Sequence, residues 1–106
     1  MDTDVDRKMI QKLVKEYIDL VKKEINVKNA YLFGSYARGK YDENSDIDIA
    51  IVSDDFTGDM IEDTFRLMRL RRKIDMRIEP HPFRTVDFDV SNPYVKEIVT
   101  KGIKVV

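Results

Sequence analysis

The chain has 106 residues, of which 42% are hydrophobic and 37% are charged, and its 19 basic and 20 acidic side chains leave a net charge of −1. This length favours a single compact domain over residues 1–106, and the balanced charge lacks the basic excess typical of proteins that bind nucleic acid directly. The absence of cysteine excludes disulfides, thiolate metal sites and cysteine nucleophiles.

The first residues are acidic and polar, unlike a signal peptide. No apolar run approaches the roughly 20 residues that cross a bilayer as a helix. The sequence therefore predicts a cytoplasmic protein that makes no contact with a membrane.

Residues 4–26 carry the clearest helical pattern. Apolar side chains recur at four-residue steps and are joined by three further ones; the run is Val5, Met9, Leu13, Tyr17, Val21 and Ile25, with Ile10, Val14 and Ile18. The positions between them are mainly charged. This pattern predicts an amphipathic helix packed on a sheet.

A short aromatic-rich strand, Tyr31–Phe33, is expected to end in a tight turn at Gly34. Because glycine has no Cβ, the backbone there can approach a ligand closely. Ser35 is a good N-cap for a helical turn through Arg38, which Gly39 would close. Such a turn presents free N–H groups, and the sequence therefore predicts a seat for phosphate, although Gly-Ser alone is a common turn.

A β-branched strand is expected to run from Asp46 to Val52. Asp46 and Asp48 share one face of it, because side chains alternate along a strand, and the isoleucines beside them share the other. Two carboxylates this close repel unless a cation lies between them. The pair suits Mg²⁺ with phosphate oxygens as the remaining ligands, whereas an isolated Asp-x-Asp is most often a solvated face.

A second helix is expected from about Asp59 to Lys73. Its core stripe is predicted to contain Ile61, Thr64, Phe65 and Met68. Met60, Leu67 and Leu70 widen the apolar arc beyond what one sheet contact requires. The excess fits either further burial within the domain or a surface for a partner.

Residues 74–79 alternate cleanly and stop at Pro80, which predicts a third strand. Its isoleucines and methionine would face the core and leave Asp75, Arg77 and Glu79 on the opposite face. If this strand lies beside the Asp46–Val52 strand, Asp75 completes a cluster of carboxylates. Glu79 is the alternative if Asp75 points away, and Arg77 and Glu79 are otherwise expected to pair with neighbouring charges.

The end of the chain carries weaker signals. His81 lies between two prolines, and a lone loop histidine is more often polar surface than a catalytic group. Asn92 and Pro93 are a good helix start, Gly102 would end that helix, and residues 103–106 would form a closing strand.

The segment G-S-Y-A-R-G-(x)5-S-D-I-D, from Gly34 to Asp48, resembles the G-S-x10-D-x-D signature of the minimal nucleotidyltransferase (MNT) family of the DNA polymerase β-like superfamily. The resemblance implies an α/β (α+β) fold of the polymerase β palm type, a small mixed sheet with helices packed on one side. It also implies a site in which acids bind two Mg²⁺ ions and act in catalysis while the glycine-serine turn binds ATP. The acids are Asp46, Asp48 and Asp75, and the nucleotide-binding residues are Gly34, Ser35 and Arg38.

This site would transfer a nucleoside monophosphate and release pyrophosphate, with Asp75 receiving the proton of the acceptor hydroxyl. In the MNT family the partner is typically a HEPN-domain toxin ribonuclease, and the antitoxin transfers AMP from ATP to a toxin tyrosine. The resemblance implies that function here, in assembly with such a partner. Two alternatives are an antitoxin that acts by occlusion alone and an enzyme that nucleotidylates a small molecule such as an antibiotic.

Overall fold

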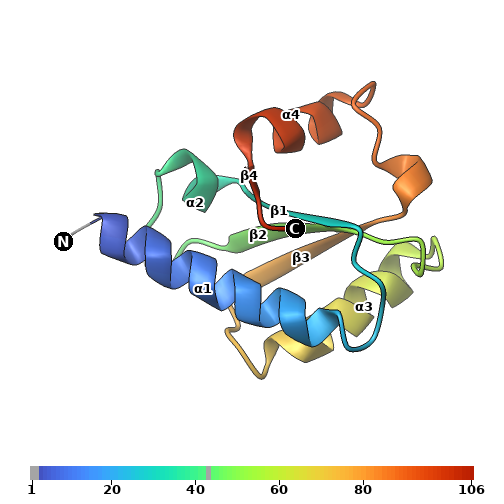
Figure 1. The fold of residues 1–106 in the computed structure, drawn as a ribbon, viewed down its shortest axis with the longest axis horizontal. Helices are drawn as coiled ribbons and strands as arrows, with labels where there is room; N and C mark the ends of the chain where they lie inside the picture. The colour runs from blue at the N-terminus through green and yellow to red at the C-terminus, as the bar shows by residue number, and fades with distance from the viewer. Residues whose placement is uncertain (1–2, 43) are drawn as a thin grey trace.

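A computed structural model of the protein describes residues 3–42 and 44–106, with side chains described from residue 7 onward. The elements follow one another as α1 (Thr3–Val21), β1 (Asn29–Phe33), α2 (Ser35–Arg38), β2 (Ile47–Val52), α3 (Met60–Arg71), β3 (Ile78–Phe83), the 3₁₀ turn η1 (Thr85–Asp87), α4 (Pro93–Lys101) and β4 (Ile103–Lys104). The four-stranded sheet has the order β3-β2-β1-β4 (Figure 1). The β2–β3 pair is parallel and β1 is antiparallel to both of its neighbours, so the sheet is mixed, as expected.

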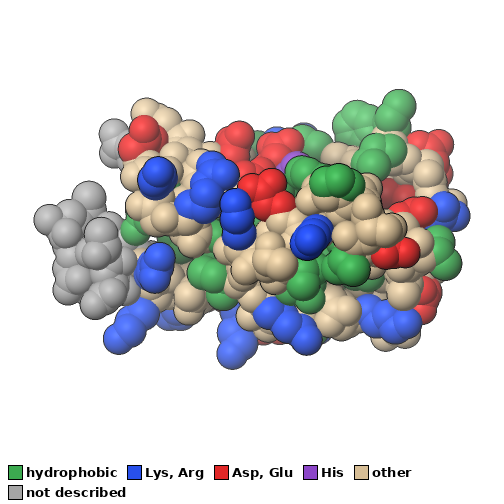
Figure 2. Space-filling model, turned by 90° about the horizontal axis from the view of Figure 1, so that it is seen from above, with side chains coloured by type: hydrophobic (Ala, Val, Ile, Leu, Met, Phe, Trp, Pro, Cys, Tyr) green, Lys and Arg blue, Asp and Glu red, His purple; other side chains and the backbone are tan. Residues whose placement is uncertain are grey.

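The two faces of the sheet differ in character. One is covered by α1 and α3, whose apolar side chains form the main core with those of Ala30, Leu32, Ile47, Ile49, Ile51 and Ile78. The helix α4 lies on the other side and covers only part of that face (Figure 1). Seen from the α4 side, acidic side chains gather beside the one histidine of the sequence (Figure 2). No helix of the described residues is long and apolar enough to cross a membrane.

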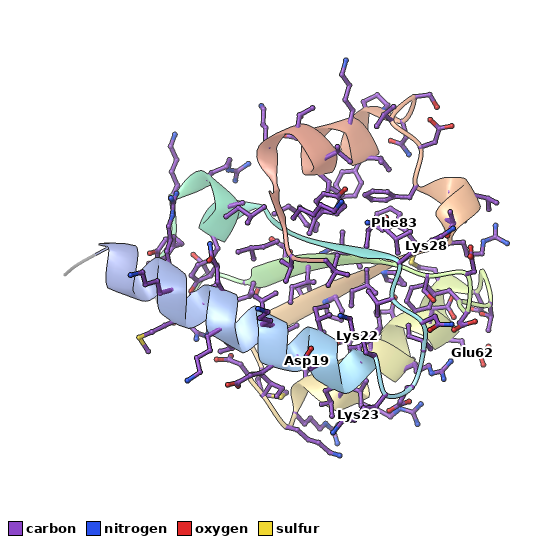
Figure 3. All side chains as sticks on the ribbon, viewed as in Figure 1. Asp19, Lys22, Lys23, Lys28, Glu62 and Phe83 are labelled. Carbon is purple, nitrogen blue, oxygen red and sulfur yellow. The ribbon has the colours of Figure 1, made fainter. Side chains whose placement is uncertain are left out.

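Helix α1 buries a stripe that follows the true helical period. Its buried residues, with one just beyond its end, are Ile10, Val14, Tyr17, Ile18, Val21 and Ile25. Met9, expected in the stripe, is 64% exposed; each four-residue step moves a side chain about 40° around the helix, so a run of such steps leaves the core. Asp19 on its outer side is exposed, as are Lys22 and Lys23 in the turn that follows the helix (Figure 3). The side chain of Val5 lies outside the described residues.

Helix α3 faces the core with a different side from the one predicted. Asp63, Leu67 and Leu70 are buried, whereas Ile61 and Phe65 are 70% and 63% exposed. The buried carboxylate of Asp63 accepts hydrogen bonds from Thr57 N, Thr57 Oγ1 and Gly58 N, each at 3.0 Å. These bonds connect the preceding turn to the side of the helix that carries Asp63, Leu67 and Leu70. The number of apolar residues on each helix face does not predict them.

Strand β3 begins later than predicted and continues through Pro80 and Pro82. The alternation is the expected one, with Ile78 buried and Glu79 half-buried, but residues 74–77 belong to the turn after α3. The Arg77 carbonyl accepts a hydrogen bond from the N–H of Ile47 in β2, and the Phe83 carbonyl accepts one from the N–H of Ser53, just after β2. The Ile78 carbonyl instead points away from β2 and accepts from the side chain of Arg71. Even-numbered residues of β3 therefore face away from β2, so neither proline removes a ladder hydrogen bond.

The Tyr17 hydroxyl joins α1 to α3, because it donates a 2.6 Å hydrogen bond to the carbonyl of Leu67. Burial raises the pKa of Tyr17 well above its usual value. Replacing Tyr17 with Phe leaves that buried carbonyl without its donor, and we expect the free energy of unfolding to fall by about 1–3 kcal/mol. Urea unfolding measures this; Tyr31→Phe, at a half-exposed tyrosine of β1, is the control and should change little. Equal losses in the two variants would contradict the role of the bond.

Candidate active site

Two neighbouring strands, β2 and β3, bring polar groups to the sheet face opposite α1 and α3. Asp48 of β2 is paired with Phe33 of β1 on one side and with Glu79 of β3 on the other. Residues paired across a ladder share a face, so the Asp48 and Glu79 carboxylates lie on the same side of the sheet. Asp46, two residues before Asp48, is exposed just ahead of β2. Asp46 and Asp48 thus lie at one end of the sheet, next to the end of β1.

The backbone of Gly34 lies directly against the carboxylate of Asp48. A Cβ at Gly34 would collide with Asp48 Oδ2 and lie 3.2 Å from Cγ. Gly34 also has φ 74° and ψ −145°, a conformation open essentially to glycine alone. The turn from β1 into α2 therefore presses main chain onto the second acid of the Asp-x-Asp pair.

The turn itself differs in one detail from the expected one. Gly34 occupies the N-cap position of α2, and Ser35, predicted to be the cap, is the first helical residue. No side chain caps this helix. Gly39 closes it in the left-handed conformation at φ 75°, as predicted. Arg38, in the last turn of α2, is exposed.

His81 contacts Asp48 from the neighbouring strand. Its Nε2 lies 3.1 Å from Asp48 Oδ1, and its ring meets that of Phe33 edge-on with centroids 5.0 Å apart. The flanking prolines predict a loop at His81, whereas the structure places it within β3. The signal that finds it is the continued alternation Glu79, His81, Phe83, which puts all three on the half-exposed face of β3.

Asp75 does not lie on a strand beside β2, contrary to the prediction. It belongs to the turn before β3, where Arg77 Nη2 lies 2.8 Å from its Oδ2 and the Arg77 N–H donates to its Oδ1. These hydrogen bonds hold the pKa of Asp75 below its usual range. Arg77 Nη1 donates in turn to the hydroxyl of Tyr36 at 3.2 Å. Asp75 is thus part of a contact between this turn and α2, and the register gives the place beside Asp48 to Glu79.

The acids of this face suit a magnesium ion in kind. Carboxylate oxygens are the ligands that Mg²⁺ prefers, together with water and substrate phosphates. Asp48 fits this role, since it lies open enough to be reached, with 24% of its side chain exposed. Within the described part of the chain, no three acidic or histidine side chains come together closely enough to hold a metal by themselves. Asp46 and Asp48 therefore offer a partial ligand set that a phosphate would have to complete.

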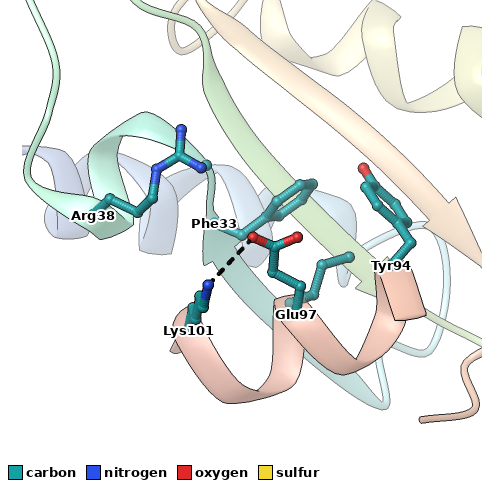
Figure 4. Close-up of a pocket in the computed structure, with 8 residues that line it drawn as sticks. Phe33, Arg38, Tyr94, Glu97 and Lys101 are labelled. Carbon is teal, nitrogen blue, oxygen red and sulfur yellow. Dashed lines mark ion pairs between the residues drawn. The ribbon is translucent and has the colours of Figure 1, made fainter. Parts of the chain in front are cut away.

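A pocket of about 160 Å³ opens beside Gly34, between β1, α2 and α4 (Figure 4). Its wall combines aromatic rings with both signs of charge, from Phe33, Tyr94, Arg38, Glu97 and Lys101. Burial, followed by the charge of Asp48, raises the pKa of the Tyr94 hydroxyl. Lys101 Nζ lies 3.8 Å from Glu97 Oε1. Apolar rings with cations at the rim suit a ligand that joins a flat ring to an anionic group.

The contact between Gly34 and Asp48 predicts a specific cost for adding a methyl group. Gly34→Ala should lower the free energy of unfolding by about 2 kcal/mol or more, from backbone strain and from the clash with the carboxylate. Gly39→Ala, which has a similar φ but meets only a side-chain nitrogen of Arg7 at 3.5 Å, should cost about 1–2 kcal/mol.

A double-mutant cycle with Asp48→Ala isolates the clash in chemical-denaturation measurements. Removing the carboxylate should make Gly34→Ala less costly and leave the cost of Gly39→Ala unchanged. Full additivity of Gly34→Ala and Asp48→Ala would contradict the contact.

The Asp75–Arg77 pair predicts acid-dependent stability. The folded-state pKa of Asp75 is depressed, so its contribution is complete above the unfolded value of about 3.9 and is lost as the pH falls through the folded value. Wild type should therefore melt above Asp75→Asn at neutral pH, and the gap should narrow at the lowest pH at which both still fold. Asp19→Asn, at an exposed residue of α1, is the control; a gap for Asp75→Asn that is constant with pH would argue against the pair.

Comparison with known proteins adds to this geometry. Two Methanocaldococcus jannaschii proteins, each named "putative protein adenylyltransferase", are similar to this chain. MJ0604 is 50% identical over 46 residues, which are 42% of this chain and 46% of that protein. MJ1379 is 28% identical over 89% of this chain and 91% of that protein. A Sulfolobus solfataricus crystal structure named "putative nucleotidyltransferase" shares the fold, with a TM-score of 0.67 and 23% identity over 98% of this chain and 86% of that one.

A crystal structure named as a toxin-antitoxin with AMP-PNP also shares the fold, with a TM-score of 0.64 and 24% identity over 91% of this chain and 72% of that one. The family model described as "Polymerase beta, Nucleotidyltransferase" matches residues 15–106. The match covers the glycine-serine turn, the Asp-x-Asp pair and the whole of the sheet. The chain therefore belongs to the polymerase β nucleotidyltransferase family and is a nucleotidyltransferase.

Proposed function

We propose that this nucleotidyltransferase is a Mg²⁺-dependent antitoxin that transfers AMP from ATP to a tyrosine of a HEPN-type toxin and so neutralises it. The observation that carries the proposal is the contact between Gly34 and the Asp48 carboxylate. It joins the two halves of the G-S-x10-D-x-D signature in space, so that a phosphate lying on the turn also lies next to the acids.

In this proposal the nucleotide binds along the turn and the pocket beside it. The main chain at Gly34 and Ser35 approaches the β- and γ-phosphates. Arg38 and Lys101, which line the pocket, carry the positive charge that the triphosphate requires, and the rings of Phe33 and Tyr94 are placed to contact the base.

Asp46 and Asp48 would hold Mg²⁺, with Glu79 in place of Asp75 as the third acid, because Glu79 is the residue in register with Asp48. A bound Mg²⁺ neutralises phosphate charge and lowers the barrier to attack at the α-phosphorus. The tyrosine oxygen forms a bond to that phosphorus, the bond to the bridging oxygen breaks, and pyrophosphate leaves. The Glu79 carboxylate is our candidate for the acceptor of the tyrosine proton, since its side chain is 44% exposed and the residue is in register with Asp48.

A protein acceptor agrees with the shape of the site. Asp46 is exposed, and the side chains of Asp48 and His81 are 24% and 30% exposed, so solvent reaches all three. A tyrosine on a folded partner can reach such a face. The names of the two similar M. jannaschii proteins, and of the toxin-antitoxin structure with AMP-PNP, support the same class of acceptor and donor.

The roles of the acids predict an order of activity. With Mg-ATP and the toxin present, Asp48→Asn should abolish AMP transfer and Glu79→Gln should slow it by about 100-fold, the scale of lost proton transfer. Asp75→Asn should leave the rate nearly unchanged, because Asp75 is bound to Arg77 in the turn before β3, whereas Glu79 is the residue in register with Asp48. Intact-mass spectrometry of the toxin measures the AMP adduct, and circular dichroism checks that each variant folds.

The same variants separate transfer from occlusion. If Asp46→Asn with Asp48→Asn forms no adduct yet still neutralises the toxin, the chain acts by binding alone. A loss of rate in Asp75→Asn but not in Glu79→Gln would restore Asp75 to the site and reject the assignment of Glu79.

A further inference from the structure

The exposed side of α3 carries an apolar surface that the fold leaves uncovered. Met60, Ile61 and Phe65 are 64%, 70% and 63% exposed, and with Thr64 and Met68 they line a hollow of about 260 Å³. We call these five residues the α3 surface. Isolated exposed apolar residues are ordinary, but several large ones on one helix face mark an interaction surface. This surface lies on the opposite side of the sheet from Asp48.

The charges beside the α3 surface match one another. Glu62 and Arg69 are both exposed and are seven residues apart, so they lie within about 20° of each other on the same flank of the Ile61–Phe65–Met68 stripe. Figure 3 shows Glu62 pointing away from the body of the molecule. The two residues have opposite signs and lie near opposite ends of the helix.

From this pattern we infer that the α3 surface binds a second copy of the chain, with the two α3 helices antiparallel. A two-fold axis near Phe65 brings Ile61 over Met68 of the second copy and sets Glu62 beside its Arg69. Antiparallel helices place the same flank of each against the other, so the pairing occurs twice by symmetry. A different protein would need apolar and charged residues spaced to match Ile61, Met68, Glu62 and Arg69, whereas an antiparallel second copy of α3 provides them.

The contact is small for a protein–protein interface. A 12-residue helix is about 18 Å long, and a pair of such helices buries less than the roughly 1,600 Å² of a standard interface. We therefore expect a reversible dimer with a dissociation constant in the micromolar range. Because α3 and Asp48 lie on opposite sides of the sheet, each copy of the dimer keeps an open site.

Analytical ultracentrifugation from low to several hundred micromolar chain tests the inference. Wild type should shift from monomer to dimer. Glu62→Arg and Arg69→Glu should each weaken the dimer by about tenfold, because each replaces two attractive pairs with two repulsive ones. The double variant Glu62→Arg with Arg69→Glu restores opposite charges and should recover the wild-type constant.

Lys12→Glu, at an exposed residue of α1, is the matched charge reversal and should leave the dimer intact. Phe65→Asp should give a monomer whose thermal melt stays close to that of wild type, since Phe65 contributes little to the core. A wild-type chain that stays monomeric at every concentration overturns the inference. The same holds if the monomeric chain binds a different protein through α3. A double variant that dimerises no better than the single ones also overturns it.

Discussion

The closeness of the Gly34 main chain to the Asp48 carboxylate is the constraint on which the site depends. It requires β1 and β2 to be adjacent and antiparallel, with Phe33 opposite Asp48, so that the chain leaving β1 turns across the start of β2. It also requires a residue without a Cβ at the turn. The hydrophobic core under β1 and β2 holds the two strands in this register and so keeps Gly34 against Asp48.

The second strand of the site is set by a different kind of contact. The buried Asp63 fixes the start of α3, and the side chain of Arg71 at its end donates to the Ile78 carbonyl. The Arg71 contact holds the first residue of β3, and the register of β3 on β2 places Glu79 next to Asp48. The Asp75–Arg77 pair closes the turn between the two elements. A change of a few residues in the start of one edge strand is enough to exchange Glu79 for Asp75.

The parts that the sequence predicts well are those fixed by local rules. The glycine-serine turn, the alternation that puts Asp48 on the face opposite the buried isoleucines of its strand, and the Asn92-Pro93 helix start each depend on neighbours within a few residues. The rotation of α3 could not be predicted in this way, since the hydrogen bonds of Asp63 outweighed the apolar count. The position of His81 could not be predicted for a related reason, because prolines usually end a strand. Only the sheet order shows that β3 has β2 on one side alone, so that Pro80 and Pro82 remove no hydrogen bond between strands.

Those two prolines have a further effect at the border of the sheet. β3 is a border strand, and its outward-facing positions 80 and 82 have no N–H to offer. Another polypeptide that tried to extend the sheet there would find carbonyls without the alternating donors that such pairing needs, so the border resists fibre-like stacking. Recognition of a substrate protein at this end of the molecule must therefore rely on side chains rather than on shared backbone pairing.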